Sequence, residues 1–149
     1  MSVRIRAAEV RDVAALVRTY EWLFAPPGSL PPRWDAEVAA AALEEAIGSE
    51  DSVVLVADDG GALVGICTTY LDLRSVRFGR RAWVEDLAVD PARRSEGIGK
   101  RLLDAAKDWA RERRATHLEL DSGVARADAH RFYEREEPSS RSVCFGWDL

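Results

Sequence analysis

Cysteine and histidine are scarce in this chain, and it lacks any long apolar run. Its 149 residues include two cysteines that stand alone and far apart, Cys67 and Cys144, and two histidines, His117 and His130. These numbers exclude a disulfide framework and a metal cluster, so we expect no metal and two buried core thiols. No apolar run approaches the roughly 20 residues of a membrane span, and residues 1–11 lack the apolar stretch of a signal peptide. A cytoplasmic protein without a membrane segment is therefore predicted.

A surplus of positive charge is also missing. Lysine and arginine number 21 against 26 for aspartate and glutamate, which gives a formal net charge of -5. This balance argues against a general nucleic-acid binder, which usually carries a basic surplus. The composition, 47% hydrophobic and 32% charged, is that of a globular protein and not of a disordered one. We expect one domain of ordinary size over residues 1–149.

Hydrophobic periodicity predicts an α/β (α+β) domain with a central mixed, mostly antiparallel sheet flanked by helices. The turn at 58–61 and a second turn at Gly79 separate three strand-like runs, which we expect to form an antiparallel meander. The predicted order is β-α-α-β-β-β-α-β-α-β, with strands near 3–6, 52–57, 62–73, 83–89, 117–120 and 143–149 and helices near 10–20, 35–47, 97–113 and 125–136.

One segment, 25–32, holds four of the six prolines. Proline fixes its own φ and lacks an amide hydrogen, so this segment is predicted to be a loop. It is either a plain connector or the wall or lid of a pocket, since loops often carry specificity. Asp35 follows it and can cap the second helix.

The stretch from Leu87 to Lys100 combines a strand end, a short loop and two glycines that open a long amphipathic helix. The first amides of a helix lack intrahelical acceptors and lie at the positive end of the helix dipole. Phosphates bind such ends, above all where glycine lets the backbone come close. Arg93, Arg94 and Lys100 add positive charge. The pattern favours a pyrophosphate site, and the competing interpretation is a solvated, arginine-rich helix start.

Glycine spacing excludes two common phosphate motifs. A Walker A loop needs glycine where this chain has Arg94, and serine or threonine where it has Arg101. A dinucleotide fingerprint needs a third glycine where Leu102 stands. What remains is Arg94-x-x-Gly97-x-Gly99.

This motif, Arg94-Ser95-Glu96-Gly97-Ile98-Gly99, resembles the Arg/Gln-x-x-Gly-x-Gly/Ala motif of the GNAT superfamily of N-acetyltransferases. Residues 85–91 resemble that family's fourth strand, and residues 129–135 resemble its late helix. The predicted order of elements is similar as well, so the resemblance extends over nearly the whole chain. It implies a single GNAT-like domain that moves an acetyl group from acetyl-CoA to an amine.

The resemblance also implies where acetyl-CoA would bind. In this family the fourth and fifth strands splay apart, and the pantetheine arm lies in the gap. It would pair with backbone groups of the stretch Leu87-Ala88-Val89 as an added strand would. The pyrophosphate would lie on the amides of Arg94, Ser95, Glu96, Gly97, Ile98, Gly99 and Lys100.

Tyr133 is the candidate general acid. By resemblance it matches a tyrosine that many members place near the thioester sulfur, where a phenol with a pKa near 10 can protonate the leaving thiolate. The competing interpretation is one more core aromatic beside Phe132.

Glu85 is the first candidate for the base that removes the amine proton, and Asp86 is the second. Successive side chains on a strand face opposite sides, so only one of them should face the cleft unless a bulge intervenes. The alternative is that either carboxylate pairs with Arg80 or Arg81 on a solvated face. Because no Ser-His-Asp or Cys-His spacing supports covalent catalysis, we expect direct attack of a primary amine on the thioester.

The chain departs from the family pattern at two places. Arg126 stands where many members have an asparagine that contacts the cofactor, and residues 135–139 replace a Gly-Phe pair that often follows the late helix. A catalytically inactive CoA-binding sensor is the alternative function. The acceptor stays open among a polyamine, an aminoglycoside, an amino acid and a peptide amine, and a homodimer is suggested by the resemblance alone.

Overall fold

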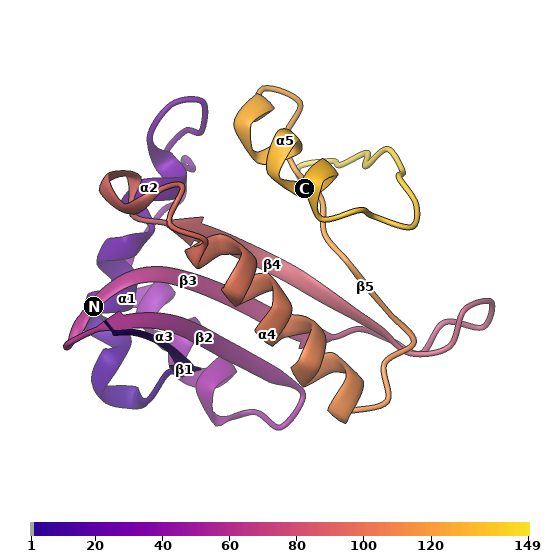
Figure 1. Cartoon of the computed structure of the whole chain (residues 1–149), viewed down its shortest axis with the longest axis horizontal. Coiled ribbons are helices and arrows are strands. Elements are labelled where there is room, and N and C mark those ends of the chain that lie inside the picture. Colours follow the sequence, from indigo (N-terminus) through magenta and orange to yellow (C-terminus); the bar gives the residue numbers. More distant parts are fainter. Residues whose placement is uncertain (1) are drawn as a thin grey trace.

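Five strands form one sheet in the computed structural model, which describes residues 2–149 (Figure 1). The four strands β1 to β4 pair antiparallel with their neighbours in sequence order, and β5 pairs parallel with β4. The predicted meander and the mixed, mostly antiparallel sheet of a single α/β domain are therefore confirmed. The strands are β1 (Val3–Ala7), β2 (Ser52–Asp59), β3 (Ala62–Leu71), β4 (Arg81–Val89) and β5 (His117–Glu119).

Helices cover both faces of this sheet (Figure 1). One face carries α4, and the other carries α1 and α3. The helices are α1 (Val13–Thr19), α2 (Glu21–Phe24), α3 (Ala36–Gly48), α4 (Ile98–Glu112) and α5 (Ala127–Arg135), and short 3-10 turns at Val10–Asp12 and Pro91–Arg93 precede α1 and α4.

Helices are needed on both faces of the sheet because β2 has apolar side chains on both faces. Leu55 packs with Leu102 of α4 in one buried cluster, whereas Val54 and Val56 pack with Leu16 of α1 in another. Successive side chains on a strand face opposite sides, so a continuous apolar run needs a partner on each face. Leu16 and Leu102 are both 0% exposed. The sheet between two helical layers is thus a rigid base for the loops at its edge.

Helix starts follow the predicted capping chemistry. Asp35 Oδ1 accepts hydrogen bonds from the amides of Glu37 at 2.8 Å and Val38 at 3.2 Å, so Asp35 caps α3 as predicted. The helix predicted over 10–20 is divided into the first 3-10 turn and α1, and the short α2 that follows at Glu21–Phe24 was not predicted.

The C-terminal prediction is wrong in two respects. Residues 136–149 contain no strand, although Val143, Phe145 and Trp147 stand at alternate positions, and Phe145 and Trp147 are 76% and 81% exposed. A period-2 pattern becomes a strand only where a partner edge can bond to it, and β5 next to it in the chain has three residues. Cys144 lies on this exposed segment and is not a core thiol. Cys67 is buried as predicted, and burial raises the pKa of its thiol to about 11.

The last two strands separate soon after they meet. Arg81 to Trp83 pair with His117 to Glu119, and β4 then continues to Val89 without β5 beside it. The resulting free edge of β4 is the structural feature around which the site is built. Within residues 2–149, no helix is both long enough and apolar enough to cross a membrane.

Candidate active site

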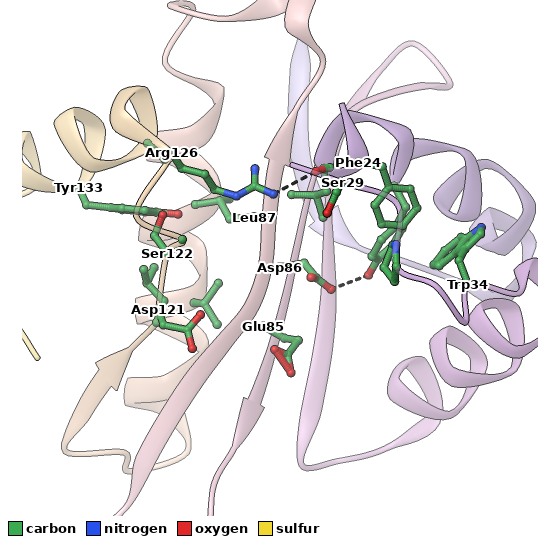
Figure 2. A pocket seen from close by; sticks show the side chains of 17 residues that line it. Phe24, Ser29, Trp34, Glu85, Asp86, Leu87, Asp121, Ser122, Arg126 and Tyr133 are labelled. Carbon is green, nitrogen blue, oxygen red and sulfur yellow. Dashed lines mark hydrogen bonds between the residues drawn. The ribbon is translucent and has the colours of Figure 1, made fainter. Parts of the chain in front are cut away.

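A cavity of about 430 Å³ opens beside β4, beyond the point where β5 leaves it (Figure 2). Its walls come from four stretches of chain, within 20–34, 84–87, 120–123 and 126–133. Ser29 and Pro31 of the proline-rich segment contribute, so of its two interpretations the pocket wall is confirmed. A cavity of this size suits a small-molecule ligand.

A bulge in β4 brings both candidate bases into the cavity wall. Thr68 faces Asp86 across the β3–β4 ladder, whereas the next residue, Thr69, faces Val84. Glu85 is therefore an extra residue on β4, and both Glu85 and Asp86 line the cavity. The alternation that would have sent one of them to the opposite face is broken at this position.

The two arginines considered as partners for these carboxylates are engaged elsewhere. Arg81 contacts Asp72 at 2.6 Å and Glu119 at 3.1 Å, and Arg80 lies 3.8 Å from Asp51. The interpretation of Glu85 and Asp86 as partners of Arg80 and Arg81 is therefore wrong.

Asp86 is held by two hydroxyl groups. Its Oδ2 accepts hydrogen bonds from Tyr20 Oη at 2.6 Å and from Thr68 Oγ1 at 3.0 Å. Burial, followed by the charge of Asp86, raises the pKa of Tyr20 far above its usual range, so this phenol keeps its proton and remains a donor. Asp86 is thus fixed in place as an acceptor (Figure 2).

Glu85 is in a different environment. It is exposed and lines the cavity, and it has no hydrogen bond or ion pair within residues 2–149. Partial desolvation, followed by the charges of Asp86 and Asp121, raises the pKa of its carboxyl. Of the two adjacent carboxylates, Glu85 is therefore the one without a partner, and its raised pKa favours accepting a proton.

Tyr133 lies on the cavity side of α5. Its ring packs against Phe132 with centroids 5.2 Å apart, but Phe132 contacts the core cluster under α4 whereas Tyr133 lines the cavity. Burial raises the pKa of Tyr133 to about 12, so its hydroxyl is protonated at neutral pH. The interpretation as a second core aromatic is not what the structure shows.

Residues 94–100, predicted to form the pyrophosphate site and called the cradle from here on, lie at the start of α4. Gly97 caps this helix with φ +79°, and Ser95 before it has φ +66°. The first hydrogen bond after the cap runs from the Arg101 amide to the Gly97 carbonyl at 3.1 Å. The amides of residues 98–100 precede this bond and lack intrahelical acceptors, as the helix-start pattern predicts. Glycine is favoured at position 97 because the left-handed backbone costs a residue with a side chain more than it costs glycine.

The three basic residues of the cradle differ in their contacts. Arg93 binds Asp59 at 2.8 Å and Glu96 at 3.0 Å, which ties the cradle loop to the β2–β3 hairpin. Lys100 contacts Asp104 at 3.2 Å and Glu136 at 3.1 Å. Arg94 is exposed and makes no ion pair within residues 2–149. Arg94 is therefore the cation best placed to receive an anion.

The β4 residues that precede the cradle face two directions. The side chains of Leu87 and Val89 pack on the α4 side of the sheet, and Ala88 packs on the α1 side. All three lie beyond Trp83, where pairing with β5 stops. Of the three, Leu87 lines the cavity, and the pairing of this segment with pantetheine, which the family resemblance implies, stays a prediction.

Several wall residues were not predicted. Arg126 donates through Nη2 to the Leu23 carbonyl at 3.0 Å and so joins α5 to α2 (Figure 2). A Cβ at Gly28 would lie 2.7 Å from this nitrogen and 1.9 Å from the Leu23 oxygen, so glycine is needed there. The sequence marks Arg126 as unusual, because it stands where many family members have an asparagine. Its contact with Leu23 could not be predicted, since the two residues are 103 positions apart in sequence.

Two more wall residues follow β5. Asp121 and Ser122 line the cavity, and Ser122 Oγ is buried without a hydrogen-bond partner in the described part of the chain. Figure 2 shows Asp121, Ser122 and Tyr133 on one side of β4, with Phe24 and Trp34 on the other. Within residues 2–149, no group of three or more His, Cys, Asp or Glu side chains is placed to hold a metal ion.

Known proteins resemble this chain in sequence and in fold. A sequence profile of the acetyltransferase (GNAT) family matches residues 16–136, which include the sheet from β2 to β5, the cradle and α5. The chain belongs to this family. As a GNAT protein it is an N-acetyltransferase, an enzyme of the acyltransferase class.

Individual relatives extend the match. YhfO of Bacillus subtilis (strain 168), an uncharacterized N-acetyltransferase, is 32% identical over 135 residues, 89% of this chain and 87% of its own. YhdJ of the same organism, also an uncharacterized N-acetyltransferase, is 36% identical over 99 residues, 66% of this chain and 69% of its own. The structure of AAC(6')-Iy in complex with a CoA-containing bisubstrate analog has the same fold, with a TM-score of 0.82 and 16% identity over all of both chains.

Proposed function

We propose that this N-acetyltransferase transfers the acetyl group of acetyl-CoA to a primary amine by direct attack of the amine on the thioester. The observation that carries the proposal is the meeting of three features at one cavity. These are the free carboxylate of Glu85, the protonated phenol of Tyr133 and the unpaired β4 edge that leads to the α4 cradle.

The residues present fit acetyl-CoA. The edge of β4 at 87–89 offers backbone groups for an extended amide-containing arm. The cradle at 94–100 offers helix-start amides and the exposed guanidinium of Arg94 for a pyrophosphate. When bound, acetyl-CoA would supply an activated acetyl group on a thiolate leaving group.

Glu85 accepts the proton of the acceptor amine, directly or through water. An alkylammonium has a pKa near 10.4, so a base must remove its proton before it can attack. Asp86 accepts two hydroxyl hydrogen bonds at Oδ2, which fix the wall, and its charge raises the proton affinity of its neighbour Glu85.

Tyr133 holds the proton that the leaving thiolate needs. Its raised pKa keeps the phenol protonated at neutral pH until the C–S bond breaks and the leaving thiolate takes the proton. Because the phenol is the weaker acid, the tyrosinate then regains a proton from solvent, to which Glu85 returns the proton that it took from the amine. The cytoplasmic location of the protein and its assembly as a homodimer remain predictions.

An acceptor screen with acetyl-CoA, read out by released thiol, tests the proposal together with a thermal-shift titration by CoA. We expect CoA to raise the melting temperature and at least one amine class to release thiol. If CoA raises the melting temperature but no amine releases thiol, the alternative function, a catalytically inactive CoA-binding sensor, is favoured over a transferase. No shift with CoA would refute the cofactor site itself.

A further inference from the structure

The cavity holds more negative charge than acetyl transfer needs. One base is enough to deprotonate an amine, yet three carboxylates, those of Glu85, Asp86 and Asp121, line the cavity. Asp86 is committed to its two hydroxyl donors. With Glu85 as the base, the carboxylate of Asp121 has no assigned role in the reaction.

Asp121 is an exposed residue that lines the cavity. It makes no ion pair within the described part of the chain, and its polar side-chain partner is the Cys144 thiol, whose pKa it raises. Its charge also contributes to raising the pKa of Glu85, so the two carboxylates act within reach of each other. Arg126 is the single basic side chain among the wall residues, and it is bound to the Leu23 carbonyl.

A second feature of the cavity is an aromatic wall. Trp34 stacks on Tyr20 with ring centroids 5.7 Å apart and forms a T-shaped pair with Phe24 with centroids 4.7 Å apart, and all three rings line the cavity. The negative faces of such rings attract organic ammonium groups. The aromatic wall and the carboxylates come from different elements and favour the same ligand charge.

We propose that the acceptor carries two cationic centres, one amine that is acetylated beside Glu85 and a second ammonium or guanidinium group that Asp121 binds. This inference rests on the proposed transferase function and narrows its acceptor to a small, dicationic amine. Asp121 is thereby a specificity residue, distinct from the base.

Paired acceptors of equal length test the idea. The kcat/KM of α,ω-diamines of three to six carbons is compared with that of the corresponding alkylamines, at saturating acetyl-CoA. For the best chain length we expect a preference for the diamine of about tenfold or more, the worth of one partly desolvated ion pair. We expect Asp121→Asn to lower that ratio about tenfold, through KM of the diamine.

Asp108→Asn is the matched control, because it makes the same substitution on the exposed surface of α4, where Asp108 pairs with Arg111. It should leave both the activity and the ratio unchanged. Calorimetric titration of CoA-loaded protein with the same amines gives a second readout, which does not depend on turnover.

Equal kcat/KM for the two amine types, or a preference that survives Asp121→Asn, would overturn the proposal. If no amine releases thiol, the transferase proposal fails instead. The calorimetric diamine preference and its loss in Asp121→Asn then still decide whether the cavity selects dications.

Discussion

Tyr20, the residue that follows α1, donates its hydroxyl to Asp86 Oδ2 on β4 over 2.6 Å. This bond joins segments 66 residues apart in sequence at the centre of the cavity wall. It also holds one of two adjacent carboxylates in a fixed position, which leaves Glu85 as the carboxylate free to exchange protons with a ligand.

We expect Tyr20→Phe to lower the free energy of unfolding by about 1.5–3 kcal/mol at pH 7, the usual worth of a hydrogen bond to a charged group. The difference from wild type should shrink above pH 10. The pKa of Tyr20 is raised in the folded state, so its contribution is complete below the unfolded pKa of about 10 and is lost as pH rises toward the folded value. Urea unfolding from pH 7 to 11 measures both effects.

Thr68→Val is the control for this prediction, because it removes the other hydroxyl donor of Asp86 without removing a group that titrates. Its cost should be the same at pH 7 and pH 11. A Tyr20→Phe cost that is equally constant with pH would contradict the role given to Tyr20.

We expect Gly97→Val to abolish the thermal shift by CoA. The left-handed backbone at φ +79° is costly for any side chain, by roughly 1–2 kcal/mol or more, and relaxation would turn the cradle amides away. Gly60→Val is a matched control, because Gly60 has φ +63° in the β2–β3 turn with open space around it. Both variants should lose stability, but Gly60→Val should keep the CoA shift. An intact shift in Gly97→Val would show that the pyrophosphate does not bind at this helix start.

Local patterns predicted most of the fold and the cradle, because these depend on neighbours in sequence. The Asp35 cap, the turn at 58–61 and the glycines that open α4 are set within a few residues. The prediction of a strand over 143–149 was wrong because strand formation depends on a distant partner edge, and the local sequence pattern contains no information about that edge.

The acceptor side of the cavity could not be predicted in the same way. The bulge at Glu85 is visible only in the pairing of β4 with β3, and the Arg126–Leu23 contact spans 103 residues. Asp121 has no surrounding motif at all, since its position depends on where β5 leaves β4. Chemistry that residues from separate elements create together requires the tertiary structure.

Arg94→Ala should weaken CoA binding more at low salt than at high salt. Arg94 is exposed and unpaired within residues 2–149, so its contribution is a charge effect that ions screen over about 10 Å at 0.1 M. Calorimetric Kd values for CoA at several salt concentrations measure it. Arg111→Ala, at the far end of α4, should change neither the Kd nor its salt dependence. A loss of affinity independent of salt would mean that Arg94 acts by packing.

The pKa of Glu85 should set the position of the acidic limb in the pH profile of kcat/KM. Desolvation and the charges of Asp86 and Asp121 raise its pKa, so replacing either aspartate by asparagine should lower that pKa and move the limb to lower pH. Glu85→Gln should remove the limb and most of the activity. Asp108→Asn should leave the profile in place. A limb unmoved by Asp86→Asn and Asp121→Asn would assign it to another group.

Tyr133→Phe should lower kcat on the order of 10²–10⁴-fold while leaving acetyl-CoA binding nearly intact, because a positioned proton donor usually contributes that much. The ring is kept, so its contact with Phe132 and the position of α5 should survive. Tyr70→Phe is the control, since it removes the hydroxyl of a half-buried tyrosine that does not line the cavity. Steady-state kcat would conceal the effect if product release limits turnover, so single-turnover thiol release is the deciding measurement. A single-turnover rate equal to that of wild type would remove Tyr133 from the chemistry and leave it as a wall of the cavity.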